Sequence, residues 1–151
     1  ANKPGVLVRI ALVFARRGYN IDSLVVSPTI NPKFSRMTIT AKGDLETLDQ
    51  IIKNVSKLID VIHCGEHDAT HSIEKELALL KVKATPSVKT FISKYARKFR
   101  IKVDDTSEGF YVVEQTGTTA ELDEFEAIMK KHTVEMVRTG KVLIAKGKEK
   151  T

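Results

Sequence analysis

The chain of 151 residues is 42% hydrophobic and 29% charged, a balance that supports one folded domain or two small modules and excludes an intrinsically disordered protein. Its single cysteine excludes an internal disulfide and a cysteine-based metal cluster. The net charge of +6 raises the question of nucleic-acid binding, and no apolar run of about 18 residues is present that would cross a membrane.

The first predicted element is a helix that starts after the loop at Pro4 and Gly5 and runs to about Arg17. Gly18 supplies a left-handed stop. Apolar residues recur with helical spacing and define one inward face: Leu7, Ile10, Ala11 and Phe14.

A hairpin and a second helix follow. Strands over 21–27 and 34–42 are joined by a turn that contains two prolines. The second helix starts at Gly43-Asp44 and runs to about Leu58. Its inward residues keep helical spacing: Leu45, Leu48, Ile51, Ile52 and Val55. Residues 59–64 are predicted to form a further strand.

These elements give the order α-β-β-α-β, which is one strand short of a βαββαβ sandwich. In that sandwich two helices cover one face of a four-stranded antiparallel sheet. Because the apolar face of the first helix needs a sheet to cover, we expect that the missing first strand precedes Ala1 in the natural protein.

A second unit repeats the full order β-α-β-β-α-β and ends with one more short strand. Its predicted bounds are 76–84, helix 86–99, strands 101–106 and 110–116, helix 119–132, and strands 134–138 and 142–145. The fold class is therefore α+β, with two tandem ferredoxin-like sandwiches. We expect domains over 1–66 and 76–151, joined by a polar linker over 67–75.

An enzyme is not indicated by any motif. His63, His67 and His71 are spaced by four and would share one face of a helix, as a metal site requires, but they follow a predicted strand that runs into a glycine. On a strand His63 and Cys64 point to opposite faces and form no nucleophile pair. We therefore expect no catalytic residue, no metal site and no cofactor in this chain.

The start of the first helix is the candidate binding site. Gly5, Val6 and Leu7 are expected to present free backbone N–H groups at the positive end of the helix dipole, where an anion binds. Asn2 beside them offers a donor and an acceptor. An ordinary capped helix remains the alternative at this point.

Three sequence blocks resemble one family. They are N-K-P-G-V-L over 2–7, R-R-G-Y-N-I-D-S-L over 16–24 and S-R-M-T-I over 35–39. The chain resembles the small, regulatory subunits of acetolactate synthase (acetohydroxyacid synthase). The resemblance continues through 58–62, 76–79 and 135–140, with a looser match in the linker and in helix 86–99.

The resemblance implies a non-catalytic regulatory subunit of branched-chain amino-acid biosynthesis. It implies an N-terminal ACT domain that forms a homodimer and binds valine, or another branched-chain amino acid, in the dimer interface. The effector residues that it implies are Asn2, Gly5, Val6 and Leu7 of one copy and Asn20 and Ile21 of the other. It also implies a catalytic large subunit as partner, which carries thiamine diphosphate, magnesium and FAD and which loses activity when valine binds.

A rival interpretation is a basic ACT-type effector module that acts on nucleic acid or on another enzyme. It rests on net charge alone, because the basic residues are spread along the chain and lack interleaved aromatic residues for base stacking. No signal or transit segment is recognised at the start of the sequence. We therefore expect no nucleic-acid or membrane partner, and a cytoplasmic location, or an organelle matrix in a eukaryote.

Overall fold

The computed structural model describes residues 1–148 and 151. The chain divides into two compact units, one over 1–73 and 143–151 and one over 74–142. This division differs from the predicted domains 1–66 and 76–151, because the segment after Val142 groups with the first unit. In the described part of the chain, no helix is long and apolar enough to cross a bilayer.

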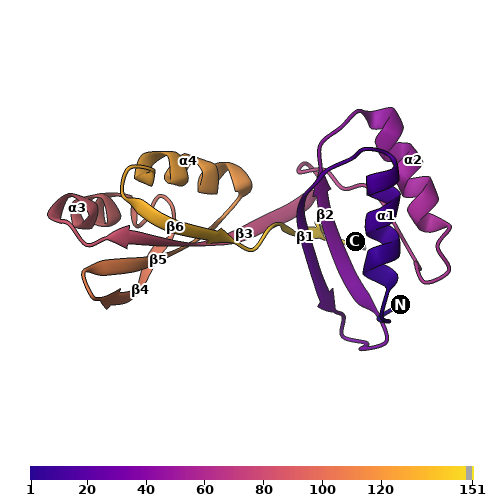
Figure 1. Cartoon of the computed structure of the whole chain (residues 1–151), viewed down its shortest axis with the longest axis horizontal. Coiled ribbons are helices and arrows are strands. Elements are labelled where there is room, and N and C mark those ends of the chain that lie inside the picture. The colour runs from indigo at the N-terminus through magenta and orange to yellow at the C-terminus, as the bar shows by residue number, and fades with distance from the viewer. Residues whose placement is uncertain (149–150) are drawn as a thin grey trace. The chain divides into compact units, whose positions relative to one another are not determined.

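The first unit contains two helices and a hairpin: α1 (Val6–Arg16), β1 (Ile21–Pro28), β2 (Ser35–Ala41) and α2 (Leu45–Ser56). The strands pair antiparallel, with Val25 opposite Thr38, and a bulge shifts the register between Ile21 and Ser23. Both helices pack on one face of the hairpin (Figure 1). Their buried residues form the core of this unit: Val6, Ile10, Phe14, Ile51 and Val55.

Local chemistry fixes where these helices begin and end. Gly18, with φ +68°, lies just after the end of α1 as expected. The Asp44 side chain caps α2 by accepting a hydrogen bond from the Thr47 N–H at 2.8 Å. The Tyr19 ring lies so close to Gly43 that a Cβ there would be 2.1 Å from it, so only glycine leaves the ring its place.

The strand predicted over 59–64 is wrong, because these residues have no strand structure. In the second unit, which has the complete order, the last strand β6 pairs with the first strand β3. The first unit, as it stands in this chain, begins with a helix. The segment 59–64 therefore has no first strand on which to form its ladder.

The predicted inward faces of both helices are partly wrong as well. Leu7 is 40% exposed and Leu45 is 76% exposed, whereas Val6, which the periodicity did not select, is buried. The buried positions of α1 are therefore 6, 10 and 14, so Ile10 and Phe14 were predicted correctly and Val6 takes the place expected for Leu7.

The second unit is a complete βαββαβ sandwich, as predicted. Its elements are β3 (Ser72–Lys83), α3 (Pro86–Tyr95), β4 (Ile101–Ser107), β5 (Phe110–Gly117), α4 (Thr119–Met129) and β6 (Thr133–Arg138). The sheet has the order β4-β5-β3-β6, and β7 (Val142–Ala145) also pairs with β3. Helices α3 and α4 lie on one face of the sheet (Figure 1).

The core of the second unit is apolar and dense. Phe99 and Phe125 are 1% and 0% exposed, with ring centroids 5.3 Å apart. Thr118 caps α4 in a capping box, in which the Glu121 carboxylate accepts the Thr118 N–H at 2.9 Å. Arg138 pairs with the buried carboxylate of Glu76 at 3.0 Å, so a charge inside the sandwich has its partner.

Candidate functional site

The loop before α1 is held against the turn between β1 and β2. The Asn2 backbone N–H donates to the Lys33 carbonyl at 2.8 Å, and the Asn2 side-chain amide donates to the Pro32 carbonyl at 3.0 Å. These two bonds fix Asn2 at the start of α1 and use one of the two N–H donors of its side-chain amide. Its carbonyl oxygen stays available as an acceptor.

Helix α1 begins at Gly5 without a side-chain cap. Gly5 has φ +81°, a left-handed conformation that suits glycine, and no side chain caps the first turn. The Val6 N–H, expected to be free, donates to the Lys3 carbonyl at a long 3.4 Å. Within residues 1–148 and 151 the N–H groups of Gly5 and Leu7 have no hydrogen-bond partner. The first turn therefore keeps backbone donors for an anion.

Positive side chains flank this turn, and a carboxylate from a distant segment balances them. Asp60 pairs with Lys3 at 3.3 Å and with Arg9, and its side chain is only 12% exposed. Burial acts to raise the pKa of Asp60, but the bonds to Lys3 and Arg9 outweigh it and hold that pKa below its ordinary value. A Cβ on Gly5 would lie 3.4 Å from the Arg9 guanidinium, so Arg9 stands beside the uncapped turn.

Asp60 was not predicted as a residue of this site. It lies 51 residues from Arg9, in the segment expected to be a strand. No local pattern marks a carboxylate that meets its partners only through the fold.

Asn20 and Ile21 lie beyond the other end of α1. The helix has 11 residues and is therefore about 16 Å long, so one copy of the chain does not bring these two residues next to Gly5. Asn20 is exposed, and Ile21 is half-buried at the bulge that opens β1. The six predicted effector residues thus form two separate groups in one chain. Asn20 and Ile21 form one group, and the other contains Asn2, Gly5, Val6 and Leu7.

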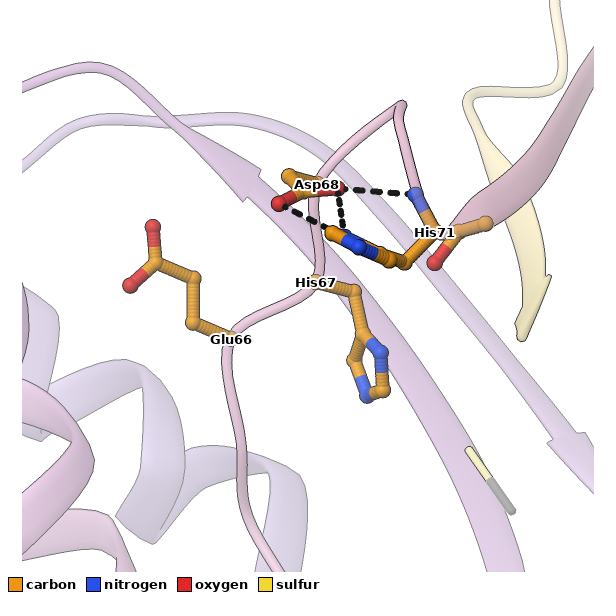
Figure 2. A pocket seen from close by; sticks show the side chains of 5 residues that line it. Glu66, His67, Asp68 and His71 are labelled. Carbon is orange, nitrogen blue, oxygen red and sulfur yellow. Dashed lines mark hydrogen bonds and ion pairs between the residues drawn. The ribbon is translucent and has the colours of Figure 1, made fainter. Parts of the chain in front are cut away.

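The three histidines at positions 63, 67 and 71 do not form a metal site in the described part of the chain. Figure 2 shows His71 turned towards Asp68, whereas Glu66 points away from both. The Asp68 carboxylate accepts the backbone N–H groups of Thr70 and His71, each at 2.9 Å, and lies 3.1 Å from the His71 ring. These bonds lower the pKa of Asp68, chiefly through the His71 backbone N–H. Asp68 therefore stabilises the turn before β3.

Cys64 has the character of a structural thiol. It is half-buried and packs against the core of the first unit. Burial raises the pKa of the thiol, against a hydrogen bond with Ser56 that lowers it. A raised pKa leaves less thiolate, so nothing at Cys64 favours a nucleophile.

Two family models match the chain, one over each unit. The model described as an AHAS small subunit-like ACT domain matches residues 1–63. The model described as the small subunit of acetolactate synthase matches residues 75–147. The two matched segments leave only the linker and the last residues uncovered.

Relatives agree over nearly the whole length. A protein of Archaeoglobus fulgidus named probable acetolactate synthase small subunit is 39% identical over 150 residues, 99% of this chain and 94% of that one. The isozyme 3 small subunit of Escherichia coli K12 is 36% identical over 148 residues, 97% of this chain and 91% of that one. The crystal structure of the acetolactate synthase small subunit from Thermotoga maritima has a TM-score of 0.85 and 34% identity, covering 98% of this chain and 93% of that chain.

Proposed function

The chain belongs to the family of acetolactate synthase small subunits, and from this premise we propose that it activates a catalytic large subunit and makes it sensitive to valine. In this proposal the large subunit carries thiamine diphosphate, magnesium and FAD, and the chain itself holds no cofactor. The protein then acts in the cytoplasm, or in an organelle matrix in a eukaryote.

The observation that supports the effector site is the uncapped start of α1. The valine carboxylate would accept hydrogen bonds from the first turn, where Gly5 allows close approach and the Arg9 guanidinium, which pairs with Asp60, lies beside it. The Asn2 carbonyl oxygen would accept a bond from the valine ammonium. One small site thus has partners for both ends of an amino acid.

A second copy of the chain would complete the site. Asn20 and Ile21 lie about one helix length from Gly5 in the same copy, so their proposed contacts with valine need a partner protomer. In the described structure β1 pairs with β2 on one side only, and its other edge offers unpaired backbone groups to a second β1. We propose a homodimer through the first unit, with valine between the copies.

Feedback inhibition requires that valine favours one arrangement of this dimer. If the favoured arrangement activates the large subunit less well, the two sites are coupled, typically by about 1–3 kcal/mol. Such a coupling would change valine affinity and large-subunit affinity by the same factor.

The test is reconstitution. Acetolactate formation is measured with the chain alone, the large subunit alone and both together, at fixed thiamine diphosphate, magnesium and FAD. We expect no activity from the chain alone, a several-fold increase in the mixture, and inhibition by valine only in the mixture. Activity of the chain alone, or a mixture that behaves like the large subunit by itself, would refute the proposal.

Calorimetric titration of the chain with valine, leucine and isoleucine identifies the effector. We expect saturable binding of at least one of these amino acids. If two-fold symmetry repeats the site, two amino-acid molecules should bind per dimer. A DNA retardation assay at physiological salt is the matched test of the nucleic-acid alternative, and tight sequence-dependent binding there would favour that alternative.

A further inference from the structure

Helix α1 has an apolar face on the side opposite its core contacts. Val8 is 61% exposed and Leu12 is 45% exposed, and Ala15 continues the same line at positions 8, 12 and 15. A surface helix ordinarily carries polar side chains there. We call this line of three residues the outer stripe of α1.

A shallow hollow adjoins the outer stripe. Its volume is about 240 Å³, and it is lined by Arg9, Leu12, Val13, Arg16 and Leu58. Leu58 comes from the segment after α2, so two separate parts of the first unit form the walls. Three of the five lining residues are apolar and two are arginines.

The charge of this surface is positive. Arg9 is already paired with Asp60, whereas Arg16 forms no ion pair with any carboxylate in the described part of the chain, and Arg17 follows it. A lining of apolar side chains beside an arginine that has no ion-pair partner within residues 1–148 and 151 suits a partner that combines apolar and acidic side chains.

A second copy of the chain is a poor occupant of this surface. In a two-fold contact the outer stripe of one protomer would pack against the outer stripe of the other. An antiparallel contact centred on Leu12 would then place Arg16 near Arg9 of the other copy, which Asp60 already pairs, so Arg16 would gain no carboxylate partner there. The β1 edge and the start of α1, which serve the proposed homodimer and valine, do not include the outer stripe.

We propose that the outer stripe and its hollow are the docking surface for an acidic and apolar segment of the catalytic large subunit. This proposal rests on the proposed function, because it names where the chain contacts the enzyme that it activates. The large-subunit segment buries its apolar side chains on Val8 and Leu12, and its carboxylates pair with Arg16.

The test titrates a fixed amount of large subunit with the chain and measures the chain concentration that gives half-maximal activation. Leu12→Gln and Val8→Gln are expected to raise this concentration about tenfold, the effect of a central interface contact. The control for both is Leu45→Gln, which alters a 76% exposed leucine at the start of α2 and should leave the concentration unchanged.

Salt and charge give a second readout. Raising the salt concentration should weaken activation by the native chain, and Arg16→Gln should weaken activation at low salt and reduce this salt dependence. Lys42→Gln, which removes one exposed charge after β2, is the matched control. An equal salt dependence in the native chain and Arg16→Gln would remove Arg16 from the interface.

The outcomes separate the two proposals. If the native chain neither binds nor activates the large subunit, the proposed function fails, and the docking partner fails with it. If the native chain activates and both stripe variants activate at the same concentration, the docking surface alone is wrong. If light scattering shows that Leu12→Gln has lost the dimer, the stripe is a contact between copies and the proposal is overturned.

Discussion

Replacing Gly5 by aspartate places a fixed carboxylate where the valine carboxylate is proposed to bind. Gly5 has φ +81° and opens the uncapped first turn of α1. A Cβ at this position meets only the end of the Arg9 side chain, at 3.4 Å, so the new side chain has room. Gly5→Asp therefore tests the charge of the site.

Two magnitudes decide the outcome. The left-handed backbone costs an ordinary residue about 1–2 kcal/mol, and aspartate and asparagine tolerate it better than most. A domain with about 5–15 kcal/mol of stability survives this cost. Loss of hydrogen bonds to a charged ligand group costs about 1.5–3 kcal/mol. Valine should therefore bind roughly 10- to 150-fold more weakly to Gly5→Asp.

The assay is valine inhibition of the reconstituted enzyme, together with calorimetric titration of the isolated chain. Gly5→Asn is the matched control, because asparagine has the same shape and the same backbone preference but no charge. We expect Gly5→Asp to activate the large subunit and to resist valine. Gly5→Asn should keep more of the sensitivity to valine than Gly5→Asp.

Two results would contradict this reasoning. Unchanged inhibition by valine in Gly5→Asp would remove the start of α1 from the effector site. Equal loss of inhibition in Gly5→Asp and Gly5→Asn would show that added bulk or backbone strain, and not charge, controls the site.

Three further changes have expected outcomes. Asn20→Ala should desensitise the reconstituted enzyme to valine with activation largely intact, and unchanged inhibition would exclude Asn20 from the site. Phe125→Ala empties a fully buried position and should lower the free energy of unfolding of the second unit by about 3–5 kcal/mol in urea denaturation, whereas the exposed control Val134→Ala should change it by less than about 0.5 kcal/mol. The pKa of Glu121 lies below its ordinary value of 4.5, chiefly because the Thr118 N–H donates a hydrogen bond to its carboxylate. The stability that this bond contributes is present above pH 4.5 and is lost as pH falls through the lowered pKa. The free energy of unfolding of Glu121→Gln should therefore depend less on acid pH than that of the native chain.

Most helices and strands could be predicted because their signals are local. Gly18 ends α1, Asp44 begins α2, and Pro86 opens α3 at the first helical position. The alternation of β3 from Glu76 to Lys83 is regular, and its even positions, such as Leu80, are buried. Each of these elements can therefore be predicted from its own residues.

The strand over 59–64 could not be judged locally, because a strand is stable only beside a partner. Its apolar residues have the composition of a strand, yet Ile59 is 97% exposed and Ile62 is 70% exposed. Only Val61 and Cys64 of this segment pack against the core. The composition of residues 59–64 favours a strand. Whether a strand forms depends on pairing with another strand, which these residues alone do not determine.

The candidate effector site stays a prediction for a similar reason. Asn2 and Gly5 are near each other in sequence, and the structure shows that the turn after β1 holds Asn2 in place. Their proposed relation to Asn20 and Ile21 depends on a second copy of the chain. Neither periodicity nor motif spacing can orient one protomer on another.

The error in the face of α1 has a physical cause that bears on function. Apolar residues surround this helix, with Val6, Ile10 and Phe14 buried and Val8 and Leu12 exposed. A periodicity argument finds a core-facing side only where the other side is polar. Here it selected Ile10 and Phe14 correctly, but chose Leu7 in place of the buried Val6. Under the docking proposal, Val8 and Leu12 contact an apolar and acidic segment of the large subunit, and Arg16, which forms no ion pair within residues 1–148 and 151, pairs with its carboxylates.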